Sequence, residues 1–166
     1  MPRKIYNLQI EFLKAFKDSF PELVDRIEIK ESSSNPNYLR FTVSPDSEDF
    51  VKFSIEIGDK TITFSSKFEE AYFATCFYPD DSEENLIRSI CEESLDYFNE
   101  FVCGNVIVEY LEEDGEVVEV SQYHVDDSCT AFSAGIMVKE RKKGSTNPTI
   151  VRRKVNWFGN VIKNDR

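Results

Sequence analysis

Carboxylates are the residues of this chain whose type and spacing could do chemistry, and four stand together: Glu112, Glu113, Asp114 and Glu116. Paired carboxylates act as acid and base in glycoside hydrolysis when one of them has a raised pKa inside a cleft. These four flank Gly115 at a predicted turn, where water would solvate them, so we expect them to bind rather than to catalyse. Opposite charge on another protein is a suitable ligand for such groups.

The glycines give no sign of a calcium or phosphate site. When Gly115 is aligned with the invariant glycine of an EF-hand loop, Tyr110 falls on the first ligand position. Ser121 then falls on the last position, where a bidentate Glu belongs. The six glycines form neither a GxGxxG motif nor a P-loop. We therefore expect neither a metal nor a cofactor.

The inventory for nucleophilic catalysis is small. His124 is the one histidine of the chain, and no GxSxG motif accompanies it. The more economical role is a surface histidine whose positive charge is favoured by neighbouring carboxylates such as Asp126 and Asp127. We expect that the protein is not an enzyme.

No export signal is visible in the first 16 residues, and no stretch approaches the roughly 20 apolar residues of a membrane span. We expect a cytoplasmic protein. In that reducing compartment cysteines without CxxC spacing should be buried thiols. The chain has four of them: Cys76, Cys91, Cys103 and Cys129.

The charge of the chain is divided along its length. The net charge is −11, and residues 46–129 carry 23 Asp and Glu against four Lys and Arg. Residues 130–166 reverse the sign, with nine basic residues against two acidic ones. Such a chain is poorly suited to nucleic acid or to an anionic membrane, and well suited to a basic protein. Two other interpretations stay open: the charge serves solubility, or the basic end compensates the acids within the fold or across a homodimer.

The elements that must position these groups begin with a helix and a meander. Apolar residues recur every three or four positions from Ile5 to Phe20, which predicts a helix that ends before Pro21. Alternating residues then predict strands, with a hairpin turn at Gly58-Asp59 and a largely buried last strand. Their expected bounds are 26–31, 38–43, 51–57, 61–64 and 71–78.

A second helix is predicted to follow. Asp81 or Ser82 can cap it, an apolar stripe runs from Ile87 to Val102, and Gly104 should end it. Its other face carries the acids Glu92, Glu93 and Asp96.

The last third of the chain reads as strands. Runs at 106–111 and 117–123 flank Asp114-Gly115 and predict a second hairpin. Residues 131–140 predict a strand and 141–149 a loop. Residues 150–160 predict a terminal strand that ends at Gly159-Asn160. Together these elements predict a single α+β domain, residues 1–166, with an antiparallel sheet (meander plus hairpin) and two main helices packed on one face.

Residues 68–118 combine an aromatic strand, an acidic helix start, an apolar-striped helix and a VIVEY strand with an acidic hairpin. In this pattern the chain resembles small bacterial immunity proteins of polymorphic-toxin and contact-dependent growth inhibition systems. The resemblance covers about a third of the chain and carries no residue role with it. It implies a non-enzymatic inhibitor that binds a toxin domain, often a basic nuclease.

We therefore expect an acidic inhibitor of a cationic toxin. The predicted contacts are first the hairpin acids Glu112, Glu113, Asp114 and Glu116, and second the helix acids Glu92, Glu93 and Asp96. Three aromatic residues are candidates for anchors of the interface or for the core: Tyr110, Tyr123 and Trp157. The alternatives are a nucleic-acid mimic that antagonises a DNA-processing enzyme, and a small-ligand-binding or structural domain whose charge serves only solubility.

Overall fold

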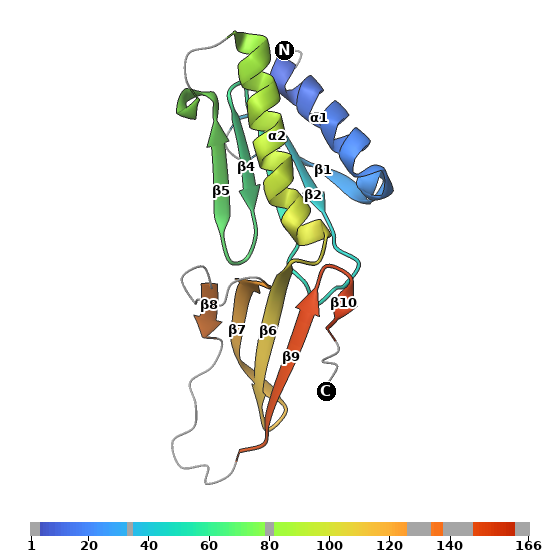
Figure 1. Ribbon diagram of the computed structural model, residues 1–166, viewed down its shortest axis with the longest axis vertical. Helices are drawn as coiled ribbons and strands as arrows, with labels where there is room; N and C mark the ends of the chain where they lie inside the picture. The colour runs from blue at the N-terminus through green and yellow to red at the C-terminus, as the bar shows by residue number, and fades with distance from the viewer. Residues whose placement is uncertain (1–3, 33–34, 79–81, 126–133, 138–147, 162–166) are drawn as a thin grey trace. The chain divides into compact units, whose positions relative to one another are not determined.

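The computed structural model describes residues 4–32, 35–78, 82–125, 134–137 and 148–161 (Figure 1). Contacts divide the chain into two compact units. The N-terminal unit is Met1–Ser44 with Lys52–Asn99, and the C-terminal unit is Pro45–Val51 with Glu100–Arg166. The single domain over residues 1–166 stays a prediction.

The α+β class is confirmed, and the meander and the second hairpin belong to separate antiparallel sheets. The N-terminal unit holds a meander in the order β1-β2-β3-β4-β5. The bounds are α1 Asn7–Ser19, η1 Pro21–Arg26, β1 Ile27–Glu31, β2 Leu39–Val43, β3 Phe53–Ile57, β4 Thr61–Ser65, β5 Glu70–Ala74, η2 Thr75–Phe77 and α2 Glu83–Val102. The α2 helix continues past Asn99 into the residues of the C-terminal unit.

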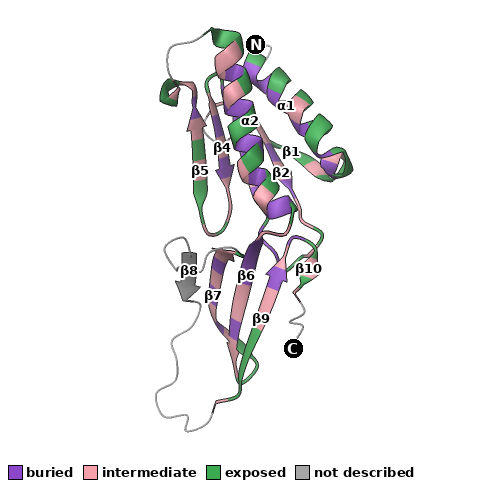
Figure 2. Cartoon of the chain, viewed as in Figure 1, coloured by how far each residue is buried: buried purple, intermediate pink, exposed green. Residues whose placement is uncertain are grey.

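Both helices pack on one face of the meander, as predicted. The Phe12 ring of α1 lies 6.3 Å from Phe41 of β2 and 6.2 Å from Phe64 of β4. From α2, the Phe98 ring lies 5.7 Å from Phe64 and 5.8 Å from Phe16 of α1. All five rings are buried. Figure 2 shows in purple the buried positions that recur along α1, α2 and the strands of this unit. The strand alternation of the sequence places these rings on one side of the sheet, and their burial is the main favourable term for the unit.

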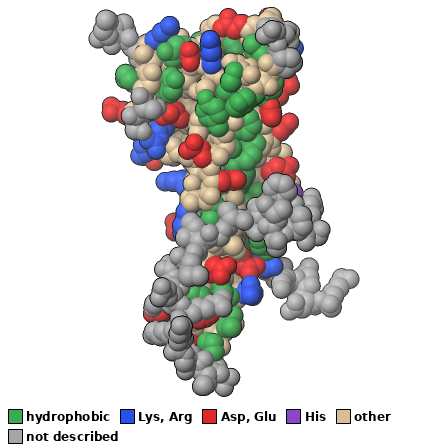
Figure 3. Space-filling model, turned by 90° about the vertical axis from the view of Figure 1, so that its left-hand side faces the viewer, with side chains coloured by type: hydrophobic (Ala, Val, Ile, Leu, Met, Phe, Trp, Pro, Cys, Tyr) green, Lys and Arg blue, Asp and Glu red, His purple; other side chains and the backbone are tan. Residues whose placement is uncertain are grey.

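The strand predicted at 71–78 is shorter and more exposed than expected. It ends at Ala74 as β5, and the 3-10 helix η2 follows. Tyr72 is 52% exposed and Phe77 is 68% exposed. The reason is position: β5 pairs with β4 at the edge of the sheet, and Tyr72 lies opposite Thr63 on the face away from the helices. Hydrophobic side chains gather on the face of this unit seen in Figure 3.

The predicted ends of the second helix are confirmed. The Ser82 hydroxyl accepts a hydrogen bond from the Asn85 amide at 3.2 Å, which is an N-cap contact. Asp81, the other predicted cap, lies outside the described residues. At the far end Gly104 takes a positive φ of 80°, and its amide donates to the Phe101 carbonyl at 3.1 Å. Glycine adopts this conformation without steric cost, so the chain can turn away from the helix there.

The sheet of the C-terminal unit has the order β10-β9-β6-β7-β8. Its predicted central hairpin is confirmed, and Asp114 (φ 51°) and Gly115 (φ 82°) both adopt the left-handed conformation of a type I′ turn. Val108, Val120, Val155 and Trp157 are buried, so Trp157 belongs to the core. The bounds are β6 Val106–Glu113, β7 Glu116–His124, β8 Ala134–Met137, β9 Ile150–Asn156 and β10 Gly159–Asn160.

The last strand differs from its prediction. The chain turns at Trp157 and Phe158 and returns as β10, so one continuous strand to Asn160 is wrong. The Asn156 side chain explains the turn, because its oxygen accepts from the amides of Phe158 (3.0 Å) and Gly159 (3.2 Å). Of the predicted strand at 131–140, residues 134–137 form β8; its other residues, and residues 141–147 of the predicted loop, lie outside the described residues.

Candidate functional site

The acids predicted first, at the β6–β7 hairpin, are partly committed to contacts inside the C-terminal unit. Asp114 holds the segment that precedes β9: its amide donates to the Thr149 carbonyl at 2.9 Å, and its carboxylate accepts from the Thr149 amide at 3.0 Å. Glu113 is half-buried, while Glu116 is exposed at the start of β7. The hairpin acids therefore do not form one free anionic surface.

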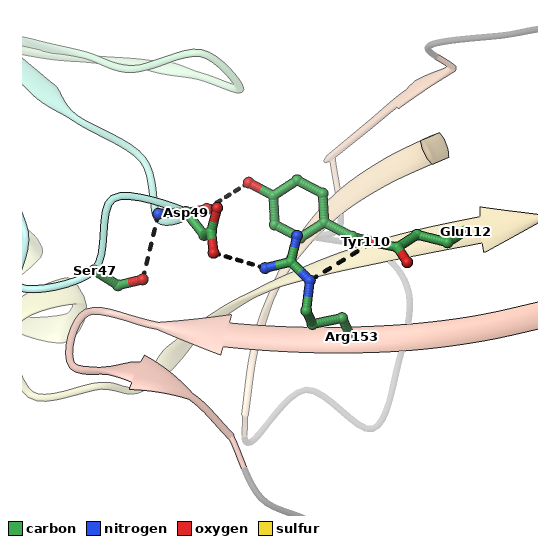
Figure 4. Close-up of polar contacts among 5 residues, drawn as sticks. All are labelled: Ser47, Asp49, Tyr110, Glu112 and Arg153. Carbon is green, nitrogen blue, oxygen red and sulfur yellow. Dashed lines mark hydrogen bonds and ion pairs between the residues drawn. The ribbon is translucent and has the colours of Figure 1, made fainter. Parts of the chain in front are cut away.

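Arg153 of β9 is the centre of a second set of internal contacts (Figure 4). Its Nη1 donates to the Asp49 carboxylate at 2.8 Å, and its Nε lies 3.7 Å from Glu112 Oε1. The guanidinium also stacks over the Tyr110 ring, 4.5 Å from its centroid, and the Tyr110 hydroxyl donates to the Asp49 carbonyl. Ser47 accepts the Asp49 amide at 3.3 Å. Tyr110 and Glu112 thus help to hold the segment 45–51 and are less available to a partner.

The charge of Glu109, which lies on the same strand as Tyr110 and Glu112, is also compensated by basic residues of β9. Its carboxylate lies 2.7 Å from Arg152 Nη1 and 3.5 Å from Lys154 Nζ. Burial raises the pKa of Glu109, but the hydrogen bond from Arg152 and the charge of Lys154 outweigh it, so this pKa lies below its ordinary value. Lys154 also lies over the Tyr123 ring, 5.6 Å from its centroid. The basic residues of β9 therefore neutralise acids of their own unit, which is one of the interpretations that the sequence left open.

The helix acids, predicted second, separate into two groups. Glu93 accepts a hydrogen bond from the Tyr78 hydroxyl, and burial together with this carboxylate raises the pKa of Tyr78 above its ordinary value. Glu92 and Asp96 are exposed on the other flank of α2 and face α1 across a groove. Within the described residues, neither Glu92 nor Asp96 has an ion-pair partner.

The groove has a volume of about 800 Å³ and is lined by α1 and α2 of the N-terminal unit. Every fourth residue of α1 lines it, and these side chains are of modest size: Asn7, Glu11, Ala15 and Ser19. Its apolar lining comes from one stripe of α2, the buried residues Ile87, Cys91 and Leu95. Residues four apart lie on one face of a helix, so each helix presents a continuous wall.

The groove is strongly anionic. Its lining includes five carboxylates and one cation, Arg88, whose guanidinium donates to Asn85 Oδ1 at 2.7 Å. The carboxylates are Glu11, Glu83, Glu84, Glu92 and Asp96. The thiol of Cys91 registers this field: burial first, and then the charges of Glu11 and Glu92, raise its pKa to about 12. A carboxylate from each helix therefore acts on the same point of the groove.

Glu11 was missed by the sequence analysis. The period of the apolar stripe selects the buried residues of α1, such as Phe12 and Phe16, and leaves the polar face unassigned. The spacing of Asn7, Glu11, Ala15 and Ser19 was visible, but nothing local says that a second helix faces it. That information resides in the sheet on which both helices pack.

The remaining candidates for chemistry are His124 and the cysteines. His124 Nε2 lies 2.6 Å from Glu100 Oε2, so a carboxylate neighbour is confirmed, although Asp126 and Asp127 lie outside the described residues. The hydrogen bonds from His124 and Asn105 hold the pKa of Glu100 below its ordinary value. Buried thiols were expected throughout, yet Cys76 and Cys103 are exposed and Cys91 is buried. The expectation is wrong for the two exposed cysteines: Cys76 lies in the short helix η2 that follows β5, and Cys103 follows the last residue of α2. Cys129 lies outside the described residues.

No protein-family model, curated protein or solved structure matches the chain, so the resemblance to immunity proteins rests on the sequence pattern alone. Within the part of the chain that the structure describes, no helix is long and apolar enough to span a membrane.

Proposed function

We propose that this chain is a non-enzymatic acidic binding protein that neutralises a basic protein through the α1–α2 groove. One observation carries the proposal: Glu11, Glu92 and Asp96 line a groove with a single cation, and no described residue pairs with them. The resemblance to immunity proteins suggests that the partner is a toxin domain.

Electrostatics supports the groove over the hairpin. Two opposite unit charges 4 Å apart gain about 4 kcal/mol at an effective dielectric constant of about 20, before desolvation is subtracted. Like charges gathered without compensation repel one another, and a partner's cations would relieve that repulsion. At the hairpin, Arg153 already supplies this relief to Glu112. We therefore place Glu92 and Asp96, with Glu11, first, and Glu112, Glu113, Asp114 and Glu116 second.

The test is a binding screen of the purified protein against purified bacterial toxin domains, some basic and some acidic, followed by activity assays of each toxin that binds. We expect binding and inhibition of at least one basic domain. Its association rate should fall about tenfold or more between about 0.05 M and about 0.5 M salt, because the Debye length shortens over that range.

The substitution Glu11→Gln/Glu92→Gln/Asp96→Asn should slow association, whereas Asp18→Asn/Glu22→Gln/Asp25→Asn changes the net charge equally outside the groove and should have little effect. The proposal would be overturned if the association rate did not change with ionic strength, or if basic and acidic toxin domains bound with equal affinity.

A further inference from the structure

We propose that the groove receives one basic amphipathic α-helix of the partner, whose Lys and Arg row meets the carboxylates of both walls. This inference rests on the proposed function and specifies the part of the partner that binds. It follows from the length of the groove, the size of its side chains and the arrangement of its charges.

The length of the groove suits a helix of three to four turns. The α1 wall runs from Asn7 to Ser19, and the α2 wall from Glu83 to Asp96. At a rise of about 1.5 Å per residue each wall is about 18–20 Å long. A partner α-helix of about the same length has the same rise per residue, so its side chains can match the spacing of those on both walls.

Side-chain size lets a helix approach. Ala15 and Ser19 line the C-terminal half of the α1 wall, and neither side chain extends far from its backbone. Packed helices lie about 8–10 Å apart when the residues between them are small or interlock. The apolar side chains of Ile87, Cys91 and Leu95 supply a narrow contact for Ala or Leu on the facing side of the partner helix.

The charges follow helical spacing. Glu84, Glu92 and Asp96 lie on one face of α2 at multiples of four residues, interrupted by Arg88. Glu11 supplies a carboxylate from the opposite wall, and its charge acts on Cys91 together with that of Glu92. A parallel partner helix with Lys or Arg at positions i, i+8 and i+12, and an uncharged or acidic residue at i+4 opposite Arg88, would match this row. Recognition of a helix in a groove is read through such anchors.

The experiment uses the whole chain and three synthetic peptides of about 14 residues, which is about four helical turns. The probe is a Lys/Ala/Leu amphipathic helix. One control keeps the Lys and Leu residues in place but replaces interior Ala residues with Pro, so that it cannot be helical; the other replaces each Lys with Glu. Affinity is measured by fluorescence anisotropy, and amide chemical shifts of the ¹⁵N-labelled protein locate the site.

We expect the helical peptide to bind at least about fivefold more tightly than the proline peptide, since the latter must lose more chain entropy and cannot align its charges. Shift changes should centre on Glu11, Ala15, Glu92 and Asp96. Glu11→Gln/Glu92→Gln/Asp96→Asn should weaken binding about tenfold, at two- to three-fold for each exposed pair. The control Asp18→Asn/Glu22→Gln/Asp25→Asn should change it less than about twofold.

The outcomes separate the two proposals. Equal affinities of the helical and proline peptides would overturn the proposal that the groove recognises a helix. The proposed function would still stand, with a groove that binds extended basic chains or polyamines. Shift changes at residues 112–116 in place of the groove would overturn the groove and leave the acidic binding function. The protein alone could instead form salt-sensitive dimers, with chemical-shift changes of the groove residues on dilution. That result would show that a second copy of the chain occupies the groove, and it would overturn the proposal that a partner's helix binds there. If neither a basic peptide nor a basic toxin domain binds, the proposed function itself fails.

Discussion

The Arg153 guanidinium lies over the Tyr110 ring, 4.5 Å from its centroid, and both side chains reach the same residue, Asp49. Asp49 is 104 positions from Arg153 in the sequence and 61 from Tyr110. The pair fastens the segment 45–51 to β6 and β9 of the C-terminal unit, and Arg153 at the same time lies beside a hairpin acid, with its Nε 3.7 Å from Glu112 Oε1.

Arg153→Ala should lower the free energy of unfolding by about 1–2 kcal/mol, because it removes the ion pairs with Asp49 and Glu112 and a cation–π contact together. Arg153→Lys keeps the charge but loses the planar stack, so its loss should be intermediate. Urea denaturation followed by tyrosine and tryptophan fluorescence measures both. The control is Arg152→Ala, which breaks only the more exposed pair with Glu109 and should cost about 0.5 kcal/mol. Equal losses at 152 and 153 would contradict the role given to the Tyr110 contact.

Neutralising the groove should stabilise the isolated protein while it weakens binding. Glu92 and Asp96 are one helical turn apart with like charge, so Asp96→Asn should raise the free energy of unfolding by about 0.2–0.5 kcal/mol. Glu92→Gln should gain less, because Arg88 lies one turn before Glu92 and its attraction to that carboxylate is lost. Thermal denaturation at low salt measures the gain, and high salt should diminish it. A loss of stability in either variant would mean that the carboxylate has a stabilising contact within the fold.

Substitutions at Asp114, in the turn of the β6–β7 hairpin, can distinguish the contribution of its backbone conformation from that of its charge. Asp114→Asn should cost less than about 0.5 kcal/mol, because Asn tolerates a positive φ and its amide oxygen can still accept from Thr149. Asp114→Ala should cost about 1–2 kcal/mol, since it loses the acceptor and strains the backbone.

Gly115→Ala is the matched comparison for this turn, because a Cβ at this position would meet nothing within 4 Å. Its cost, about 1 kcal/mol, should come from the left-handed backbone alone. Urea denaturation of the three variants gives the order, and a stable Gly115→Ala would argue against a type I′ turn.

Stability should depend on pH through Glu100. Its pKa is lowered in the folded state by hydrogen bonds from His124 and Asn105, so its contribution is present above the ordinary value of 4.5 and is lost as the pH falls through the folded value. Glu100→Gln should be about 0.5 kcal/mol less stable than the wild type at pH 7, and this difference should vanish in acid below both pKa values.

Urea denaturation across that pH range measures the Glu100 effect, with Asp18→Asn as the control for the loss of an exposed carboxylate. A difference between wild type and Glu100→Gln that persists unchanged in strong acid would show that the pairing with His124 is not its source.

Most helices and strands were predictable because their signals are local. Alternation placed Leu39, Phe41 and Val43 on one buried face of β2, and Asp114-Gly115 specified its own turn. The predictions were wrong where the burial of a residue depends on elements that are distant in the sequence. Tyr72 has the apolar character of a buried strand residue, but its burial depends on whether a further element covers the face of the sheet away from the helices.

The candidate site divides in the same way. The composition of the chain is enough to predict an acidic surface and to favour a basic partner, since charge is counted residue by residue. Which acids remain available depends on distances between residues far apart in the chain: Arg153 reaches Asp49 and Glu112, while Glu11 and Glu92 line one groove and neither has an ion-pair partner among the described residues. Compensation of charge is a property of proximity, and proximity between distant residues exists only once the sheets have assembled and the helices have packed on them.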